Sequence, residues 1–105
     1  MILFDNQKYI TQGIIESIPD GMIAILFGLI DRLKSKMEVD YLQVFNISSK
    51  KENGLCVYII KHSQEQPLYN EEIEVATLDD TTIEDCKIFV IDDVTHSTML
   101  LADEY

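Results

Sequence analysis

The longest regular pattern of apolar residues along the chain runs over residues 19–37. Apolar side chains recur there at steps of three and four, which places them on one face of an α-helix. They are Met22, Leu26, Leu29, Ile30, Leu33 and Met37. Ile23, Ile25 and Phe27 widen this face to more than half of the circumference, as in a largely buried helix. Because each such side chain contributes roughly 1.5–3 kcal/mol when buried, we expect this helix to organise the core.

Segments rich in β-branched and aromatic residues lie on both sides of this helix and predict strands. They cover residues 8–15, 40–47, 55–62, 73–78, 88–91 and 98–101. The polar residues 48–54 predict a hairpin turn. Pro67 predicts a loop over residues 63–72, because proline cannot donate to a strand ladder. Both alternating sets of residues 55–62 are apolar, which predicts a central strand with the helix on one face and partial cover on the other.

These elements together predict the fold class. Residues 73–78 alternate as an edge strand does, and residues 79–87 are typical of a turn or short helix capped by Asp80 or Thr81. A chain of this length without linker, repeat or low-complexity tract is expected to form a single domain over residues 1–105. We therefore expect an α+β fold, with one long helix packed on an antiparallel sheet of five or six strands.

The first residues, the hydropathy and the cysteines all favour a cytoplasmic location. The first ten residues lack the basic flank and the apolar run of a secretory signal. The longest apolar window, residues 22–30, is shorter than the roughly 20 residues that span a bilayer. Two cysteines without an export signal are typical of reduced thiols.

The net charge of −11 is the unusual feature of the composition, and it is confined to one part of the chain. Residues 1–64 carry seven acidic and seven basic side chains, whereas residues 65–105 carry twelve acidic side chains against Lys87 alone. Such a field repels nucleic acid and attracts basic surfaces. Repulsion among the crowded carboxylates is expected to raise their pKa values in the folded chain, so that added salt would raise the melting temperature.

The residues that could carry chemistry do not form a recognised motif. Cys56 and His62 are six residues apart on one predicted strand, roughly 20 Å at 3.3 Å per residue, so no shared metal ion is expected. Cys86 and His96 also lack ligand spacing. The four glycines are scattered, without a phosphate-binding loop, and no cofactor is expected.

Two interpretations of the acidic segment remain open from the sequence. Nine carboxylates are the candidate contact residues, and eight of them form doublets at the ends of predicted elements, mostly outside the core. The nine are Glu71, Glu72, Glu74, Asp79, Asp80, Glu84, Asp85, Asp92 and Asp93. Duplex DNA presents about one charge per 1.7 Å of its axis, and a rim of carboxylates can imitate part of that field. The alternative is that the charge only maintains solubility.

Several short blocks, in order, extend over almost the whole chain and carry a family resemblance. They are Thr11-x-Gly13-Ile14, Ile18-Pro19, Leu29-Ile30-Asp31-x-Leu33, Asp40-Tyr41-Leu42-Gln43-Val44-Phe45, His62-x-Gln64-Glu65-x-Pro67-x-Tyr69, Phe89-Val90-Ile91-Asp92-Asp93 and Ser97-Thr98-Met99-Leu100-Leu101-Ala102-x-Glu104-Tyr105. In these blocks the chain resembles domain-of-unknown-function family 960. Its members are short acidic proteins of Gram-positive bacteria, their phages and mobile elements. That setting implies an inhibitor of a host nuclease, such as an anti-CRISPR protein.

We therefore expect a non-enzymatic acidic binding protein that occludes a basic nucleic-acid-binding surface by DNA mimicry. The partner would be a basic protein such as an RNA-guided CRISPR nuclease, whose arginine-rich channel the nine carboxylates would enter. Neither direct nucleic-acid binding nor a membrane is expected. One alternative is a module that self-associates as a homodimer through the edge strand at residues 73–78. A second alternative is a small enzyme that uses the loop residues His62, Glu65 and Tyr69.

Overall fold

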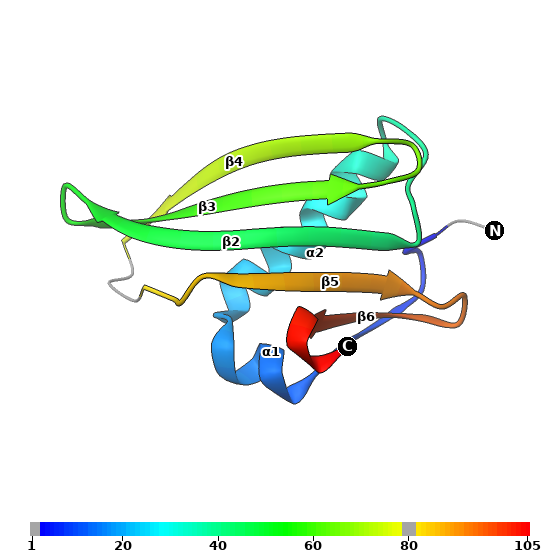
Figure 1. The fold of residues 1–105 in the computed structure, drawn as a ribbon, viewed down its shortest axis with the longest axis horizontal. Coiled ribbons are helices and arrows are strands. Elements are labelled where there is room, and N and C mark those ends of the chain that lie inside the picture. Colours follow the sequence, from blue (N-terminus) through cyan, green and yellow to red (C-terminus); the bar gives the residue numbers. More distant parts are fainter. Residues whose placement is uncertain (1–2, 79–81) are drawn as a thin grey trace.

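A six-stranded sheet with helices on one of its faces makes up the structure (Figure 1). The structure is a computed structural model, and it describes residues 3–78 and 82–105. Its elements, in chain order, are β1 (Gln7–Ile10), α1 (Gln12–Ser17), α2 (Asp20–Lys34), β2 (Leu42–Glu52), β3 (Leu55–Gln64), β4 (Tyr69–Thr77), β5 (Cys86–Asp92), β6 (His96–Leu101) and the 3₁₀ turn η1 (Ala102–Glu104). The α+β class is therefore confirmed.

The sheet is mixed, so the prediction of an antiparallel sheet is wrong at one edge. The strand order is β1-β6-β5-β2-β3-β4, and every neighbouring pair is antiparallel except β1 and β6. β1 is followed along the chain by the two helices, which are not part of the sheet. Its partner in the sheet is therefore β6, the last strand of the chain. The hairpin from β5 reverses direction into β6, which then runs parallel to β1. At the other edge β4 is the predicted edge strand.

The long helix expected over residues 19–37 is shorter in the structure, where it forms α2. α2 has 15 residues and ends at Lys34, where Ser35 caps it. The predicted strand over residues 8–15 keeps its extended form only as far as Ile10. Thr11 then begins α1, because its hydroxyl accepts a hydrogen bond from the backbone N–H of Ile14 at 3.4 Å. Thr11 was not predicted as an N-cap from the sequence.

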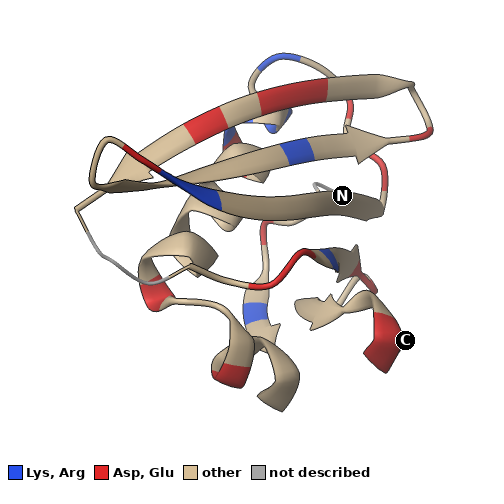
Figure 2. Ribbon diagram, turned by 60° about the vertical axis from the view of Figure 1, so that its left-hand side comes forward, with Lys and Arg blue, Asp and Glu red and all other residues tan. Residues whose placement is uncertain are grey.

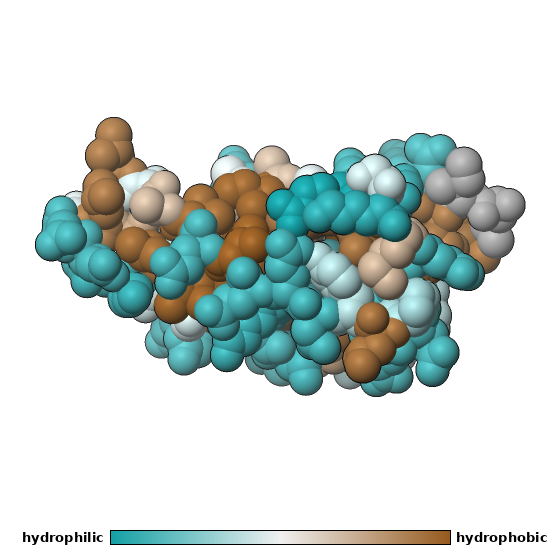
Figure 3. All heavy atoms as spheres, turned by 90° about the horizontal axis from the view of Figure 1, so that it is seen from above, coloured by the Kyte–Doolittle hydropathy of each residue, from teal (hydrophilic) through white to brown (hydrophobic). Residues whose placement is uncertain are grey.

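The core lies between α2 and one face of the sheet. The buried side of α2 consists of Met22, Ile23, Leu26, Ile30 and Leu33. The sheet contributes the buried Phe45, Ile47, Tyr58, Ile60, Ile88, Val90 and Met99, and α1 adds Ile14. Seen from the β4 edge, hydrophobic residues gather mainly in the left half of the surface, where the two layers meet (Figure 3). The pattern of the helix therefore predicted its buried face correctly.

The other face of the sheet is open. Alternation along β3 turns Cys56, Tyr58 and Ile60 toward the helix and leaves Val57 and Ile59 half-buried on the opposite side. Within residues 3–78 and 82–105, no helix crosses this side of β2, β3 and β5 (Figure 1). The Tyr105 ring lies against Phe89 on this side, with ring centroids 5.7 Å apart, so the cover found there is limited to β5. We refer to this side of the sheet as the open face.

The connections on either side of β3 are shorter than predicted. β2 continues to Glu52, so the turn consists of Asn53 and Gly54 alone, with φ angles of 54° and 79°. Asn-Gly readily adopts this pair of positive angles, which suits the twist of a hairpin. The predicted loop over residues 63–72 shrinks to residues 65–68, because β3 extends to Gln64 and β4 already begins at Tyr69. The predicted cap residues Asp80 and Thr81 lie outside the described residues.

Hydrogen bonds to Glu104 connect the C-terminal end of the chain to the beginning of α1. The carboxylate of Glu104 accepts hydrogen bonds from the Thr11 hydroxyl at 2.6 Å, from the backbone N–H of Leu101 at 2.8 Å and from that of Gly13 at 3.3 Å. These bonds lower the pKa of Glu104, the Thr11 bond most strongly. A Cβ atom at Gly13 would lie 2.6 Å from Cδ of Glu104, so this contact needs glycine.

We expect Gly13→Ala to lower the free energy of unfolding by about 1 kcal/mol, because it displaces the Glu104 carboxylate and loses its hydrogen bonds. Gly21→Ala is the matched control in α2. A Cβ there meets nothing within 4 Å, so the substitution should stabilise by roughly 0.5–1 kcal/mol through helix propensity. In a Glu104→Ala background, Gly13→Ala should become stabilising too. Urea denaturation measures all four variants, and a destabilising Gly13→Ala in that background would contradict the contact.

Candidate interaction surfaces

Seven of the nine carboxylates proposed from the sequence are among the described residues, and they are distributed over several parts of the molecule (Figure 2). Glu72 and Glu74 point to the open face of β4, and Glu71 points to the opposite side. Asp79 and Asp80 lie outside the described residues. Glu84 and Asp85 are exposed just before β5, whereas Asp92 and Asp93 are at the other end of that strand. The structure thus brings Glu72 near Glu74 and Glu84 near Asp85, but does not join these pairs.

The side chain of Asp92 is buried and makes its hydrogen bonds within the protein. It is only 5% exposed, and its carboxylate accepts hydrogen bonds from the backbone N–H groups of Phe4 and Val94 and from the side chain of Asn6. Val94 has a φ angle of 86°, so these bonds hold both the N-terminal segment and the β5–β6 turn in place. Asp92 therefore serves the fold and has no oxygen free on the surface.

Glu71 and Asp93 are also held by bonds within the chain. Glu71 accepts hydrogen bonds from the Tyr69 hydroxyl and from the Arg32 guanidinium, the latter at 2.6 and 2.7 Å. These bonds lower the pKa of Glu71. Asp93 has a lowered pKa because it accepts from the backbone N–H of His96 and the hydroxyl of Thr95. The expectation of raised pKa values is thus wrong for these two carboxylates, because hydrogen bonds to the charged form outweigh repulsion.

Glu84 and Asp85 take part in a different assembly, which we call the acidic groove. It is a hollow of about 700 Å³ between the α1–α2 bend, the segment that leads into β5, and the end of β6. Four carboxylates line it, from Glu16, Glu84, Asp85 and Asp103. Its apolar lining includes Ile15, Ile18, Ile83 and Leu101. Neither lysine nor arginine is among the described residues of the lining, so its charge is uniformly negative.

Within the described residues, the carboxylates of the acidic groove are weakly engaged. Glu16 accepts one hydrogen bond, from the side chain of Gln12 at 3.3 Å. Glu84 and Asp103 make neither a hydrogen bond nor an ion pair in residues 3–78 and 82–105. Burial and then the charge of Asp85 raise the pKa of the half-buried Cys86 thiol, which is thereby kept neutral. The groove therefore offers unpaired negative charge beside an apolar floor.

Sequence reasoning selected two of the four groove carboxylates and missed the others. Glu16 and Asp103 come from opposite ends of the chain and meet Glu84 only because β1 pairs with β6 and carries α1 with it. The isoleucine Ile15 is 55% exposed, which is unusual for so large an apolar side chain. The sequence carries no signal for this meeting, because residues 8–15 are typical of a strand and the exposure of Ile15 follows only from the fold.

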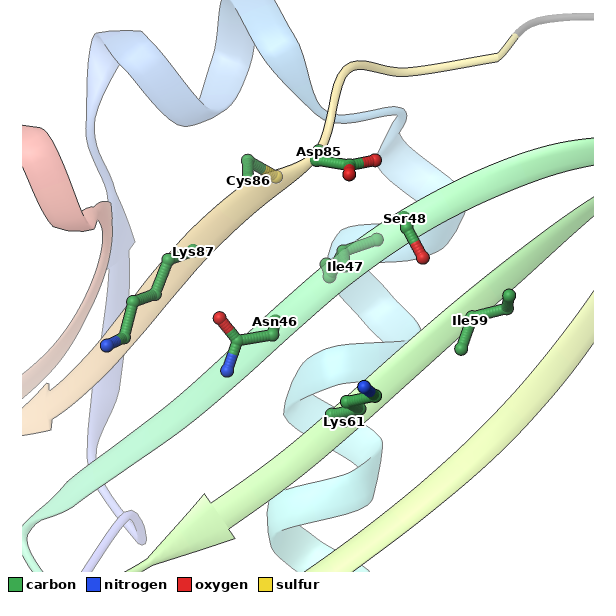
Figure 4. Close-up of a pocket in the computed structure, with 8 residues that line it drawn as sticks. All are labelled: Asn46, Ile47, Ser48, Ile59, Lys61, Asp85, Cys86 and Lys87. Carbon is green, nitrogen blue, oxygen red and sulfur yellow. The ribbon is translucent and has the colours of Figure 1, made fainter.

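A second hollow, of about 360 Å³, lies on the open face (Figure 4). Asn46 of β2 lies between Lys61 of β3 and Lys87 of β5, its direct neighbours in the two ladders. Ile59 and Ser48 continue the hollow toward Asp85, which also lines the acidic groove. The open face therefore carries positive charge at its centre, unlike the acidic groove.

The alternative catalytic trio is only partly assembled. The rings of His62 and Tyr69 are 5.5 Å apart, but Glu65 is exposed in the connection after β3. His62 is 4% exposed and stacks on Phe45, and its Nε2 pairs with Oε1 of Gln43 at 2.7 Å. Burial lowers the pKa of His62 to about 4, so the ring is neutral at pH 7. Within the described residues, no group of three His, Cys, Asp or Glu side chains is placed to hold a metal ion.

The buried polar groups around His62 fix the end of the sheet. The Gln43 side-chain amide donates to Oε1 of Gln64 at 2.8 Å. The Gln64 side-chain amide in turn donates to the backbone carbonyls of Glu38 and Pro67, at 3.1 and 2.7 Å. These bonds satisfy polar atoms that would otherwise be buried without partners. His62 is thus part of a structural hydrogen-bond network.

Comparison with known proteins places the chain in a family. A family model described as a staphylococcal protein of unknown function (DUF960) matches residues 7–104. The chain belongs to this family. The family resemblance seen in the sequence is thereby confirmed, and it extends from β1 to η1.

A solved structure shares the fold of the DUF960 chain. It is the crystal structure of a protein of unknown function from Enterococcus faecalis, 27% identical, with a TM-score of 0.78 over 97% of this chain and 92% of that one. No curated protein matches the chain significantly. In the part of the chain that the structure describes, no helix is long and apolar enough to cross a membrane.

The low pKa of His62 predicts a pH dependence of stability. In the unfolded chain the ring titrates near 6.5, whereas in the folded chain it titrates near 4, so the unfolded chain binds more protons between these values. The neutral His62 ring makes its full contribution to the free energy of unfolding above pH 6.5. This contribution falls as the pH decreases toward 4. We expect a loss of about 2 kcal/mol between pH 7 and pH 5, measured by urea denaturation.

His62→Gln keeps a side-chain donor for Gln43 but does not titrate, so it should remove most of this slope. His96→Gln is the control on the half-exposed histidine of β6 and should retain it. A His62→Gln variant that loses as much stability as the wild type between pH 7 and pH 5 would refute the assignment.

Proposed function

We propose that the protein is a non-enzymatic binding protein whose acidic groove takes a basic, partly apolar segment of another protein. The observation that supports this proposal is the combination of four carboxylates with an apolar floor in one hollow. Two of these carboxylates, on Glu84 and Asp103, have no partner within the described residues. A lysine or arginine side chain matches such a site, because its apolar stem can cover the floor while its charged end reaches the rim.

The charge of the whole chain assists this binding. At a net charge of −11, the field attracts a positively charged partner before contact and raises the association rate. The carboxylates of the groove are at the surface, so salt screens them. The apolar part of the contact is insensitive to salt. We therefore expect affinity to decrease with ionic strength without vanishing.

Occlusion of an RNA-guided nuclease is the narrower form of this proposal. Its support is the family resemblance and the acidic charge, since arginine-rich surfaces that read nucleic acid are basic partners of the required kind. In that form Glu84 and Asp85 would enter the arginine-rich surface together with Glu16 and Asp103. Glu72 and Glu74 would extend the acidic rim on β4, whereas Asp92 would stay within the fold.

A peptide titration tests the general form. The probe is a synthetic peptide of about 15 residues that alternates lysine and leucine at helical spacing, and its glutamate-for-lysine counterpart is the control peptide. We expect the double variant Glu84→Gln/Asp103→Asn to bind the lysine peptide at least tenfold more weakly than the wild type. The matched double variant Glu72→Gln/Glu74→Gln removes the same charge outside the groove and should bind within about twofold of the wild type.

Equal losses in the two double variants would mean that the peptide responds to net charge alone, and would overturn the assignment of the groove. Absence of binding at about 50 mM NaCl would overturn the proposal itself. Competition with guide-loaded nuclease for its target DNA tests the narrower form, which requires inhibition by the wild type and loss of inhibition in Glu84→Gln/Asp103→Asn.

A further inference from the structure

The open face of the sheet is unusually apolar for a surface that the helices leave uncovered, and the Tyr105 ring lies only against Phe89 there. Seven half-buried apolar side chains point outward from four neighbouring strands. They are Leu42, Val44, Val57, Ile59, Phe89, Ile91 and Leu100. Strands with one solvated face normally alternate between apolar and polar residues, so that the polar set meets water. A contiguous apolar patch of this extent marks an interaction site.

The charges on this face balance, although those of the chain do not. The outward charged side chains of β2 to β5 are three lysines, at positions 50, 61 and 87, and three glutamates, at positions 52, 72 and 74. Lys61 pairs with Glu72 at 3.9 Å and Lys50 with Glu52 at 3.1 Å. Three further carboxylates, on Asp40, Glu65 and Asp85, lie at the rim of this face, beyond the strand ends. Two copies of the chain can therefore approach through the strands of their open faces without bringing net charge together there, and the excess negative charge stays at the rim, where salt screens it.

The order of these charges suits a second copy of the same chain. Glu72, Lys61, Asn46 and Lys87 are opposite one another across β4, β3, β2 and β5, so the row is negative at one end and positive at the other. A two-fold axis along the strands between β2 and β3 reverses the row in the partner copy. Glu72 of each copy then faces Lys87 of the other, whereas Glu74 of each copy comes opposite Asp85 at the rim, where solvent screens the repulsion. Both copies use the same patch, as in an isologous dimer.

The size of the face is sufficient for a stable dimer. The molecule measures 44 × 28 × 20 Å, and the shortest dimension is the thickness of one sheet and one helix layer. A stable interface buries roughly 800 Å² on each partner, less than the area of the long and middle dimensions. Sheets packed face to face bury the apolar sets of both, as in a β-sandwich.

We propose that the protein forms a two-fold homodimer through the open faces of its sheets. The proposal goes beyond binding in the acidic groove, which uses different apolar side chains. It also differs from association through the edge of β4, where Glu71, Glu72 and Glu74 follow one another and oppose a second copy of the strand. The interface is instead the face whose centre contains Ile59 and Val44, with Phe89 and the Tyr105 ring beside them.

Sedimentation velocity and light scattering at chain concentrations from about 1 to 500 µM test this dimer. We expect a dimer in the wild type at about 150 mM NaCl and a monomer in Ile59→Lys over the same range. Ile15→Lys is the matched control, because it makes the same substitution at an exposed position on α1. It should leave the dimer intact while changing peptide binding in the acidic groove, so that failure of one proposal is distinguishable from failure of the other.

A monomeric wild type at 500 µM, or a dimer of unchanged strength in Ile59→Lys, would overturn the proposal. Circular dichroism at the working temperature verifies that Ile59→Lys is folded, and Val57→Lys provides a second variant if it is not.

A charge exchange tests the two-fold alignment. Glu72→Lys and Lys87→Glu should each weaken the dimer at least tenfold, because each places like charges opposite one another. The double variant Glu72→Lys/Lys87→Glu restores opposite charges and should recover most of the dimer. Failure of the double variant to recover any dimerisation would overturn the proposed two-fold contact.

Discussion

Packing of α2 against one face of the sheet is the contact on which the rest of the structure depends. Five side chains of α2 are buried there, from Met22 to Leu33, and they meet inward residues of the four central strands and β4. Because side chains alternate along a strand, this single contact determines the environment of every second residue in β2, β3 and β5. It also leaves the remaining residues of these strands, among them Val57 and Ile59, without cover.

The two proposed surfaces are consequences of that one-sided packing. The open face exists because α1 and α2 both pack on the same side of the sheet. The acidic groove exists because α1 and α2 meet at a bend beyond the edge of the covered face, beside the segment that enters β5. Each surface combines apolar side chains with charge. The groove is negative throughout, whereas the strands of the open face carry charges of both signs.

The acidic residues serve two distinct purposes. Asp92 and Glu104 accept backbone and side-chain hydrogen bonds that hold the two chain ends to the sheet and to α1. Glu71 is bound by Arg32 and Tyr69. In contrast, Glu84 and Asp103 are without partners in the described part of the chain. Net charge alone therefore overstates the number of carboxylates that a partner could use.

Much of the fold could be predicted from local patterns, because these depend on neighbouring residues. The buried face of α2, the hairpin of β2 and β3, and the pairing of β5 with β6 follow from apolar spacing and turn residues. The parallel pairing of β1 with β6 could not be predicted, since it joins segments about 90 residues apart. The acidic groove depends on the same pairing.

The role of Asp92 was predictable in part. It follows Ile88 and Val90 on the same side of β5, and that side is buried. A carboxylate at this position must find hydrogen bonds inside the protein. Asp93, one residue further, points the opposite way and remains exposed. Treating the two as one acidic pair concealed this difference.

The central claim, that one face of the sheet is covered and the other is open, is tested most directly by alanine substitution at neighbouring residues of β3. Ile60 is completely buried beneath α2, whereas Ile59 points to the open face. At concentrations where the chain is monomeric, Ile60→Ala should lower the free energy of unfolding by about 2–5 kcal/mol and Ile59→Ala by less than about 1 kcal/mol. Equal losses, or a larger loss for Ile59→Ala, would contradict the account.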